Sequence, residues 1–253
     1  MTFRASFRSN SVFVATALVA IILVGCVEKK VESEAETQVE SPHSETDDVY
    51  RAAFLIMDGT FNSELTAPYD IFHHTKFREG IKPIEVFTIA STLSPITTFE
   101  GLRLTPDYSY LGDFPSIDIL IIPAAEHHLD GDLENEHLIE FIRQAGGSAT
   151  YVLSLCDGAF PLAESGLLSG KTCTTFPSDR QALRDRYSEL TVLDSVLWVH
   201  DGKFITSAGG AKSFEPALYM VELLYGADVA NATGQGMVID WHVEDYPHTV
   251  VSA

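Results

Sequence analysis

The sequence predicts an α/β domain in which a doubly wound, mainly parallel sheet carries helices on both faces. Two observations support this prediction. Short, continuous apolar runs alternate with segments of helical periodicity through residues 49–226, as in sheets that helices cover on both sides. The apolar run at 148–155 also leads directly into Cys156, Asp157 and Gly158, and a strand that turns sharply into a helix is typical of this architecture.

The expected elements follow one another from residue 49, where the run at 49–59 is read as the first buried strand. Further strands are expected over 84–91, 116–124, 148–155 and 171–176, a strand pair over 97–107, a hairpin over 196–210, and helices over 62–75, 133–147, 158–166, 178–187 and 213–226. The hairpin turn is Asp201-Gly202, a strong turn signal. We expect one domain over 49–253, with the tail from about residue 240 unassigned.

Residues 1–25 have the pattern of a bacterial lipoprotein signal peptide. Arg4 and Arg8 form a basic start, and the apolar run at 12–24 is too short for a typical transmembrane helix. The run ends in Leu-Val-Gly-Cys, which resembles a lipobox with Cys26 as the lipidated residue. We expect a lipid anchor in the bacterial cell envelope, with the outer membrane and periplasmic side favoured. The alternative is an ordinary secretory signal followed by a chance cysteine.

The segment at residues 26–48 is acidic and contains few large apolar residues. It cannot bury enough surface to offset the entropy of ordering, so we expect a disordered tether. The chain as a whole has a formal net charge of -20, which disfavours binding to nucleic acid and to anionic lipid headgroups. The expected partners are a small-molecule substrate or ligand and, through the lipid anchor only, a membrane.

Three segments reach the edge of the predicted sheet where doubly wound folds bind their ligands, beyond the carboxyl ends of the strands. They carry Gly59 after the first strand, Ala124-Ala125 after the central strand, and Cys156 after the next one. A cysteine at this turn faces the N–H groups and the positive end of the following helix, and both favour the thiolate. The alternatives are an inert buried cysteine or a disulfide with Cys173.

Three blocks of the sequence resemble the ThiJ/PfpI superfamily, within the class I glutamine amidotransferase-like fold. The family's nucleophile elbow is matched by SLCDGAFPLAESGLLSGKTCTTFP, its first strand and helix by FLIMDGTFNSELTAPYDIF, and its closing strand and helix by DGKFITSAGGAKSFEPALYMVELLYG. The resemblance spans most of residues 49–226 in the family's order and implies a single flavodoxin-like domain. It is nearest to isonitrile-hydratase-like members and to the amidase-like domains of AraC-type regulators.

The resemblance implies roles for individual residues. Cys156 matches the nucleophile, and Glu64 matches a carboxyl group that approaches the thiol. Asp157 would supply a backbone N–H to an oxyanion hole, in the sharp turn that contains Gly158. A protonated carboxyl group can donate a hydrogen bond to a thiolate, so we expect a raised pKa for Glu64. The alternative for Glu64 is a first-turn glutamate that only stabilises its helix.

Two departures from the family pattern bear on the chemistry. Many relatives carry a histidine where this chain has Phe176, so no imidazole is in place to take a proton from the thiol. Relatives often have two glycines where Ala124 and Ala125 stand, and the change bears on the geometry of the oxyanion hole. His127 and His128 follow on the same rim, and either is a candidate substitute for the lost imidazole.

The leading expectation is a cysteine-dependent hydratase or lyase, or a glyoxalase-like enzyme, that acts on a small electrophile. Protease and amidase chemistry is disfavoured without the histidine. The alternatives are a non-catalytic small-molecule binding domain and a redox sensor in which Cys156 oxidises to a sulfinate. No cofactor or metal is expected, because the chain lacks a P-loop, a dinucleotide fingerprint and metal-ligand spacing. The resemblance also implies a homodimer.

Overall fold

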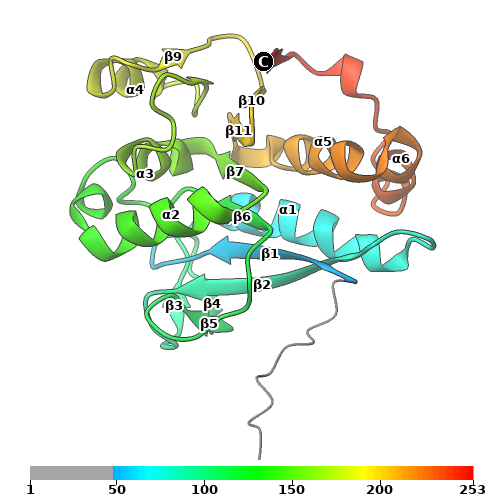
Figure 1. The fold of residues 1–253 in the computed structure, drawn as a ribbon, viewed down its shortest axis with the longest axis horizontal. Coiled ribbons are helices and arrows are strands. Elements are labelled where there is room, and N and C mark those ends of the chain that lie inside the picture. The colour runs from blue at the N-terminus through cyan, green and yellow to red at the C-terminus, as the bar shows by residue number, and fades with distance from the viewer. Residues whose placement is uncertain (1–47, 253) are drawn as a thin grey trace, which may run out of the picture. The chain divides into compact units, whose positions relative to one another are not determined.

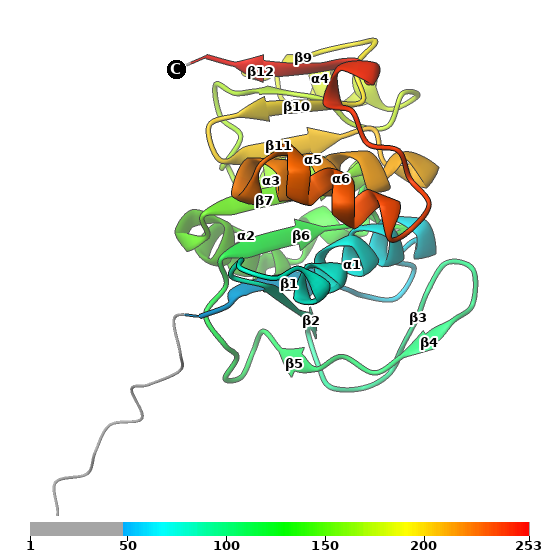
Figure 2. The ribbon, with the colours of Figure 1, turned by 90° about the vertical axis from the view of Figure 1, so that its right-hand side faces the viewer.

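A computed structural model describes residues 48–252, and its central feature is an eight-stranded sheet (Figure 1). In spatial order the strands are β12 (His248–Val251), β10 (Trp198–Asp201), β11 (Phe204–Ser207), β7 (Tyr151–Leu155), β6 (Ile119–Ile122), β1 (Tyr50–Leu55), β2 (Ile84–Ala90) and β5 (Tyr108–Ser109). Neighbouring strands run parallel except in the β10–β11 hairpin. Figure 2 shows the strands stacked in this order. The sheet confirms the predicted doubly wound, mainly parallel α/β fold.

Strand β1 illustrates why the central strands are apolar without alternation. Its Ala53 and Leu55 belong to the hydrophobic core on one face of the sheet, whereas Ala52 and Phe54 belong to the core on the other face. All four side chains are buried. Because both faces of the strand are covered, successive positions favour apolar residues, and the period of two disappears.

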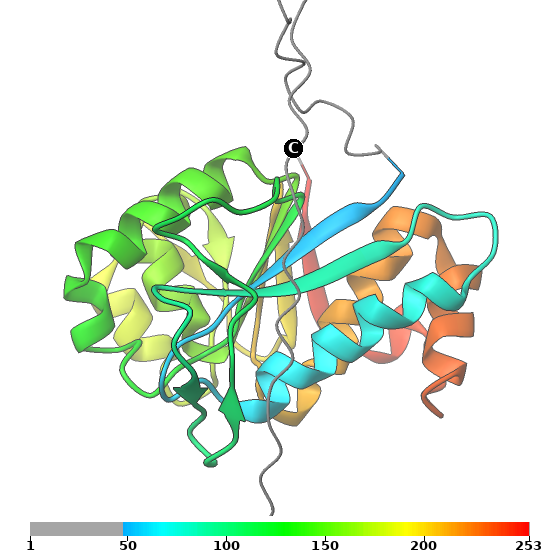
Figure 3. The ribbon, with the colours of Figure 1, turned by 90° about the horizontal axis from the view of Figure 1, so that it is seen from below.

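Helices cover both faces of the sheet (Figure 3). On one face lie α1 (Asn62–His74), α5 (Phe214–Tyr225) and α6 (Ala227–Gln235). On the other lie α2 (Glu136–Ser148), α3 (Ala159–Glu164) and α4 (Arg180–Arg186). Short 3-10 turns complete the described part: η1 (Thr75–Phe77), η2 (Gly131–Glu134), η3 (Cys156–Gly158), η4 (Gly210–Lys212) and η5 (Val243–Asp245).

Two small two-stranded sheets lie apart from the main one. They are formed by β3 (Ile96–Thr97) with β4 (Arg103–Leu104) and by β8 (Thr172–Cys173) with β9 (Thr191–Val192). The run at 171–176 is therefore not the full strand that its sequence predicts. Its backbone N–H groups bind side chains instead: Thr172 N donates to Asp201 Oδ2 at 2.8 Å, and Thr174 N donates to Thr206 Oγ1 at 2.9 Å.

The C-terminal tail, unassigned from the sequence, ends in the edge strand β12. Aromatic packing holds it against the sheet: the His248 ring stacks on Trp198 with centroids 4.7 Å apart, and Trp241 stacks on Tyr246 at 5.3 Å. Because such contacts follow no helical or strand period, the sequence pattern does not reveal them.

The N-terminal predictions lie outside the described residues. These are the signal peptide at 1–25, the lipidation of Cys26 and all but the last residue of the tether at 26–48. Within residues 48–252, no helix combines the length and the apolar character needed to cross a membrane.

Candidate functional site: an elbow cysteine among carboxyl groups

Cys156 lies where β7 ends and η3 begins, at the carboxyl ends of the parallel strands. Its φ angle is 52°, a left-handed conformation that is costly for a residue other than glycine. Two glycines allow the surrounding backbone to approach it. A Cβ on Gly158 would lie 2.1 Å from the carbonyl oxygen of Ile122, and a Cβ on Gly209 would lie 2.4 Å from the Cys156 Cβ. The elbow therefore depends on close contact with β6 and with the loop after β11.

Glu64 is brought to this elbow from the first turn of α1 and is only 3% exposed. Its Oε2 accepts a hydrogen bond from Ala124 N at 2.9 Å, and its Oε1 accepts one from Gly210 N at 3.0 Å. The carboxyl group also bonds with the Cys156 thiol. Burial raises the pKa of Glu64, and the two backbone bonds oppose but do not cancel this effect. Glu64 thus links three segments of the fold beside the thiol.

The pKa of the Cys156 thiol is raised, which differs from the thiolate that the sequence predicts at a helix start. Burial is the largest cause, and the carboxyl groups of Glu64 and Asp157 add to it. The backbone N–H of Asp157 bonds with the thiol and acts in the opposite direction, but it is outweighed. The helix that follows, α3, has only six residues, so its dipole is small. The resting thiol is therefore protonated and needs a proton acceptor before it can attack.

The side chain of Asp157 is half-buried and lies in hydrogen-bond contact with the thiol. The Thr175 hydroxyl donates a hydrogen bond to the Cys156 carbonyl oxygen at 2.8 Å, and its Oγ1 also lies 3.2 Å from Asp157 Oδ1. Burial raises the pKa of Asp157 to about 7, and the nearby Asp179 and Glu64 carboxyl groups contribute. A carboxyl group with this pKa exchanges its proton near neutral pH.

The two alanine N–H groups predicted for the oxyanion hole are both engaged inside the protein. Ala124 N donates to Glu64, as described above, and Ala125 N donates to His128 Nδ1 at 3.2 Å. Gly59 brings the neighbouring loop close to this rim: its φ is 80°, and a Cβ there would lie 2.8 Å from the Glu126 Cβ. A ligand oxygen could bind the alanine N–H groups only after these internal bonds are broken.

Neither candidate histidine is placed as a base for the thiol by a contact in the structure. His128 is fully buried; burial lowers its pKa to about 3, and its neutral ring accepts the Ala125 N–H bond. His127 is exposed, with Nδ1 3.3 Å from Asp130 Oδ1. Phe176 is 39% exposed and directly follows Thr175, and its ring has no proton to transfer. The disulfide alternative is wrong, because Cys156 and Cys173 are both free.

Four residues that the structure places around the elbow were not predicted as site residues: Thr175, Asp179, Gly209 and Gly210. A glycine pair directly after an apolar strand was the available signal for the last two. Thr175 carried no signal of its own, because its contact with the elbow spans 19 residues of chain.

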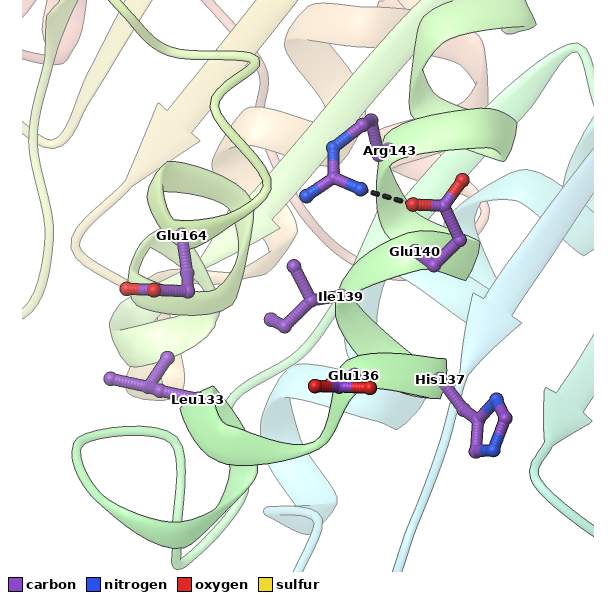
Figure 4. A pocket seen from close by; sticks show the side chains of 7 residues that line it. All are labelled: Leu133, Glu136, His137, Ile139, Glu140, Arg143 and Glu164. Carbon is purple, nitrogen blue, oxygen red and sulfur yellow. Dashed lines mark hydrogen bonds and ion pairs between the residues drawn. The ribbon is translucent and has the colours of Figure 1, made fainter.

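A separate hollow of about 520 Å³ lies between η2, α2 and α3 (Figure 4). It is lined by Leu133, Glu136, His137, Ile139, Glu140, Arg143 and Glu164. Arg143 pairs with Glu140 of its own helix, and neither Cys156 nor Glu64 lines the hollow. Among residues 48–252, no group of three or more His, Cys, Asp or Glu side chains is arranged to hold a metal ion.

Comparison with known proteins matches residues 50–223 to the DJ-1/PfpI family. Isonitrile hydratase of Pseudomonas putida is 30% identical over 177 residues, which cover 70% of this chain and 73% of the hydratase. The Parkinson disease protein 7 homolog of Danio rerio is 28% identical over 186 residues, which cover 71% of this chain and 92% of the homolog. The crystal structure of a ThiJ/PfpI family protein from Pseudomonas syringae superposes with a TM-score of 0.68 at 21% identity, covering 81% of this chain and 84% of that one.

Proposed function

The chain belongs to the DJ-1/PfpI family, and on this basis we propose that it is an enzyme whose Cys156 adds to a small electrophilic substrate in a hydratase or lyase reaction. The observation that carries the proposal is the contact between the Cys156 thiol and the Glu64 carboxyl group, which two backbone N–H groups hold in place. A thiol with carboxyl groups in hydrogen-bond reach can add to a polarised carbon without a histidine. The similarity to isonitrile hydratase makes isonitriles the first substrate class to test.

For an isonitrile, R–N≡C, the chemistry balances as a hydration. The sulfur of Cys156 bonds to the terminal carbon and the thiol proton is transferred to that carbon, which yields S–CH=N–R. Water then adds its oxygen to the same carbon and one proton to the nitrogen. Cleavage of the C–S bond returns the second water proton to sulfur and releases the formamide R–NH–CHO. The protein ends the cycle unchanged, and no oxidant or reductant is consumed.

The test is turnover of small isonitriles and α-oxoaldehydes by the full chain, followed by NMR of the formamide or hydroxy acid product. We expect Cys156→Ser to reduce turnover to the background rate, because the hydroxyl is a far weaker nucleophile at neutral pH. The control is Cys173→Ser, whose buried thiol lies outside the site and whose loss should leave turnover unchanged. Turnover that survives in Cys156→Ser would contradict a covalent cysteine mechanism.

A binding or sensing domain is the second candidate, and the protonated state of the thiol favours it. Such a domain would bind a small molecule, or oxidise at Cys156, without turning a substrate over. If the full chain consumes neither substrate class, yet ligands raise its melting temperature or peroxide converts Cys156 to a sulfinate, the second candidate replaces the first.

We further propose that the protein is lipid-anchored through Cys26 in a bacterial cell envelope and forms a homodimer. The basic start, the short apolar run and the Leu-Val-Gly-Cys sequence support the anchor. Membrane fractionation and mass spectrometry of the N-terminal peptide test it, with Cys26→Ser as the variant that should lose the lipid. Analytical ultracentrifugation tests the dimer, for which the family resemblance is the support.

A further inference from the structure

We propose that the Asp157 carboxyl group carries the proton between the Cys156 thiol and the substrate, the task that an imidazole performs in a Cys-His pair. The inference rests on the proposed function and assigns a second catalytic residue to the same site. It starts from a problem that the geometry poses: the thiol is protonated, His128 is buried and bonded to Ala125 N, and His127 faces Asp130.

Asp157 meets the first requirement of a proton carrier, which is contact with the reacting atom. Its side chain is in hydrogen-bond contact with the Cys156 thiol, and Asp157 directly follows Cys156 in η3. Unlike Glu64, it is half-buried rather than buried, so it can exchange protons with a bound substrate or with water.

Thr175 meets the second requirement, an anchor that serves both protonation states. Its hydroxyl group has one hydrogen and two lone pairs. When Asp157 is ionised, the Thr175 hydroxyl can donate its hydrogen to Asp157 Oδ1, which lies 3.2 Å from Oγ1. When Asp157 is protonated, the hydroxyl can donate to the Cys156 carbonyl oxygen, 2.8 Å from Oγ1, and accept a hydrogen bond from the Asp157 carboxyl group. The carboxyl group therefore gains and loses its proton without losing its position.

Glu64 is less suited to this task. Both of its oxygens accept backbone N–H bonds, from Ala124 and Gly210, and the side chain is 3% exposed. The bonds hold the carboxyl group in one orientation, so it positions the thiol and the two loops. Moving a proton to a substrate would require Glu64 to leave partners that hold those loops together.

The electrostatic surroundings match the proposed task of Asp157. The groups that act on it are the carboxyl groups of Asp179 and Glu64, the Thr175 hydroxyl and the Cys156 thiol, and together with burial they place its pKa at about 7. A base of this strength is half ionised at neutral pH and can both accept and return a proton. The negative neighbours also disfavour anionic substrates, which fits a neutral electrophile.

In the resulting step, the S–H bond breaks as the S–C bond forms, and the thiol proton passes to Asp157 Oδ. The substrate carbon, which then carries the electron pair, takes that proton from Asp157 and becomes S–CH=N–R. When the C–S bond later breaks, Asp157 transfers the proton from the carbon-bound hydroxyl to sulfur. Asp157 begins and ends the cycle ionised.

The experiment measures the rate at which iodoacetamide alkylates Cys156 in the full chain between pH 5 and 10, by mass spectrometry of the peptide that contains it. In the unmodified protein we expect an inflection near pH 7, where the pair loses its first proton. In Asp157→Asn we expect this inflection to disappear and the rate at pH 7.5 to fall by about tenfold or more, because the thiol must then ionise unaided in the alkaline range.

The direction of the change separates the proposal from a purely electrostatic role. The Asp157 charge raises the pKa of the thiol, so removing a mere neighbour would lower that pKa and speed alkylation at neutral pH. A faster reaction in Asp157→Asn, or an unchanged inflection near pH 7, overturns the proposal. Asp179→Asn is the matched control: it removes a carboxyl group that acts on Asp157 and should move the inflection to lower pH without abolishing it.

Alkylation needs no substrate, so its outcome is independent of the proposed hydratase activity. If the inflection depends on Asp157 but no isonitrile or oxoaldehyde is consumed, the proton carrier stands and the proposed function fails. If substrates are consumed and Asp157→Asn lowers kcat less than twofold with an unchanged pH profile, the proposed function stands and the proton carrier fails. Melting curves of each variant establish that it is folded.

Discussion

The substitution Glu64→Ala should destabilise the fold, because Glu64 accepts hydrogen bonds from two backbone N–H groups in separate loops. The bond from Ala124 is buried, and an unsatisfied buried N–H costs about 1–3 kcal/mol. The bond from Gly210 is partly buried, and its loss costs about 0.5–1.5 kcal/mol. We therefore expect the free energy of unfolding to fall by about 1.5–4.5 kcal/mol at pH 5.5.

The pH dependence has a definite sign. The pKa of Glu64 is raised in the folded protein above its ordinary value of 4.5, so its contribution to stability is complete below that value and is lost as pH rises through the folded pKa. The alanine variant lacks this dependence. The difference in the free energy of unfolding between the two proteins should thus be larger at pH 5.5 than at pH 8.

Urea denaturation at the two pH values measures this difference. The matched control is Glu136→Ala, which removes an exposed first-turn glutamate of α2 and should cost only the helix-dipole interaction, about 0.3–1 kcal/mol. If Glu64→Ala costs no more than Glu136→Ala at pH 5.5, Glu64 is merely a first-turn glutamate, and its role in joining the loops is refuted. A difference that grows with pH would refute the sign of the pKa shift.

Two further predictions concern other parts of the fold. Gly209→Ala should destabilise the protein and slow alkylation of Cys156 far more than Gly210→Ala. Both glycines have a positive φ, but only at Gly209 would the new Cβ meet the elbow backbone, 2.6 Å from Cys156 N. Equal effects of the two substitutions in urea denaturation would contradict the steric argument. Asp201→Asn should weaken the pairing with Lys171 and reduce the free energy of unfolding by about 1–3 kcal/mol at pH 7. Because the pKa of Asp201 is lowered from 3.8, this loss should shrink as pH falls below about 4, and a loss that persists at pH 3 in urea denaturation would show that charge is not its cause.

Much of the fold was predictable because a strand that is buried on both faces has a continuous apolar sequence. The apolar run that contains Ala52 and Phe54 needs no partner to be recognised, and a run of this kind that enters Cys156-Asp157-Gly158 indicates an elbow. Short elements were less predictable. The run that contains Thr174 has the composition of a longer strand, but it pairs with β9 only over Thr172–Cys173, and side chains of β10 and β11 accept the N–H groups of Thr172 and Thr174.

The candidate site was also predictable only in part. Cys156 and Glu64 were predicted from local sequence and the family resemblance, and the structure brings them into contact. The N–H partners of the Glu64 carboxyl group, at Ala124 and Gly210, lie 60 and 146 residues away in the chain. His128 is a candidate base by its position in the sequence, yet burial leaves it neutral and bound to a backbone N–H.

The sequence by itself determined the covered parallel sheet, the elbow and the presence of Phe176 after Thr175, because hydrophobic period, turn chemistry and residue identity are local properties. Only the tertiary structure decided that Cys156 is protonated and that Asp157 lies between the thiol and Thr175. The physical reason is that a pKa depends on burial and on charges brought close by the fold, and neither is encoded within a few residues of the group that titrates. The strand-turn-helix elbow thus follows from its own segment of sequence, whereas the protonation state of Cys156 depends on the whole domain.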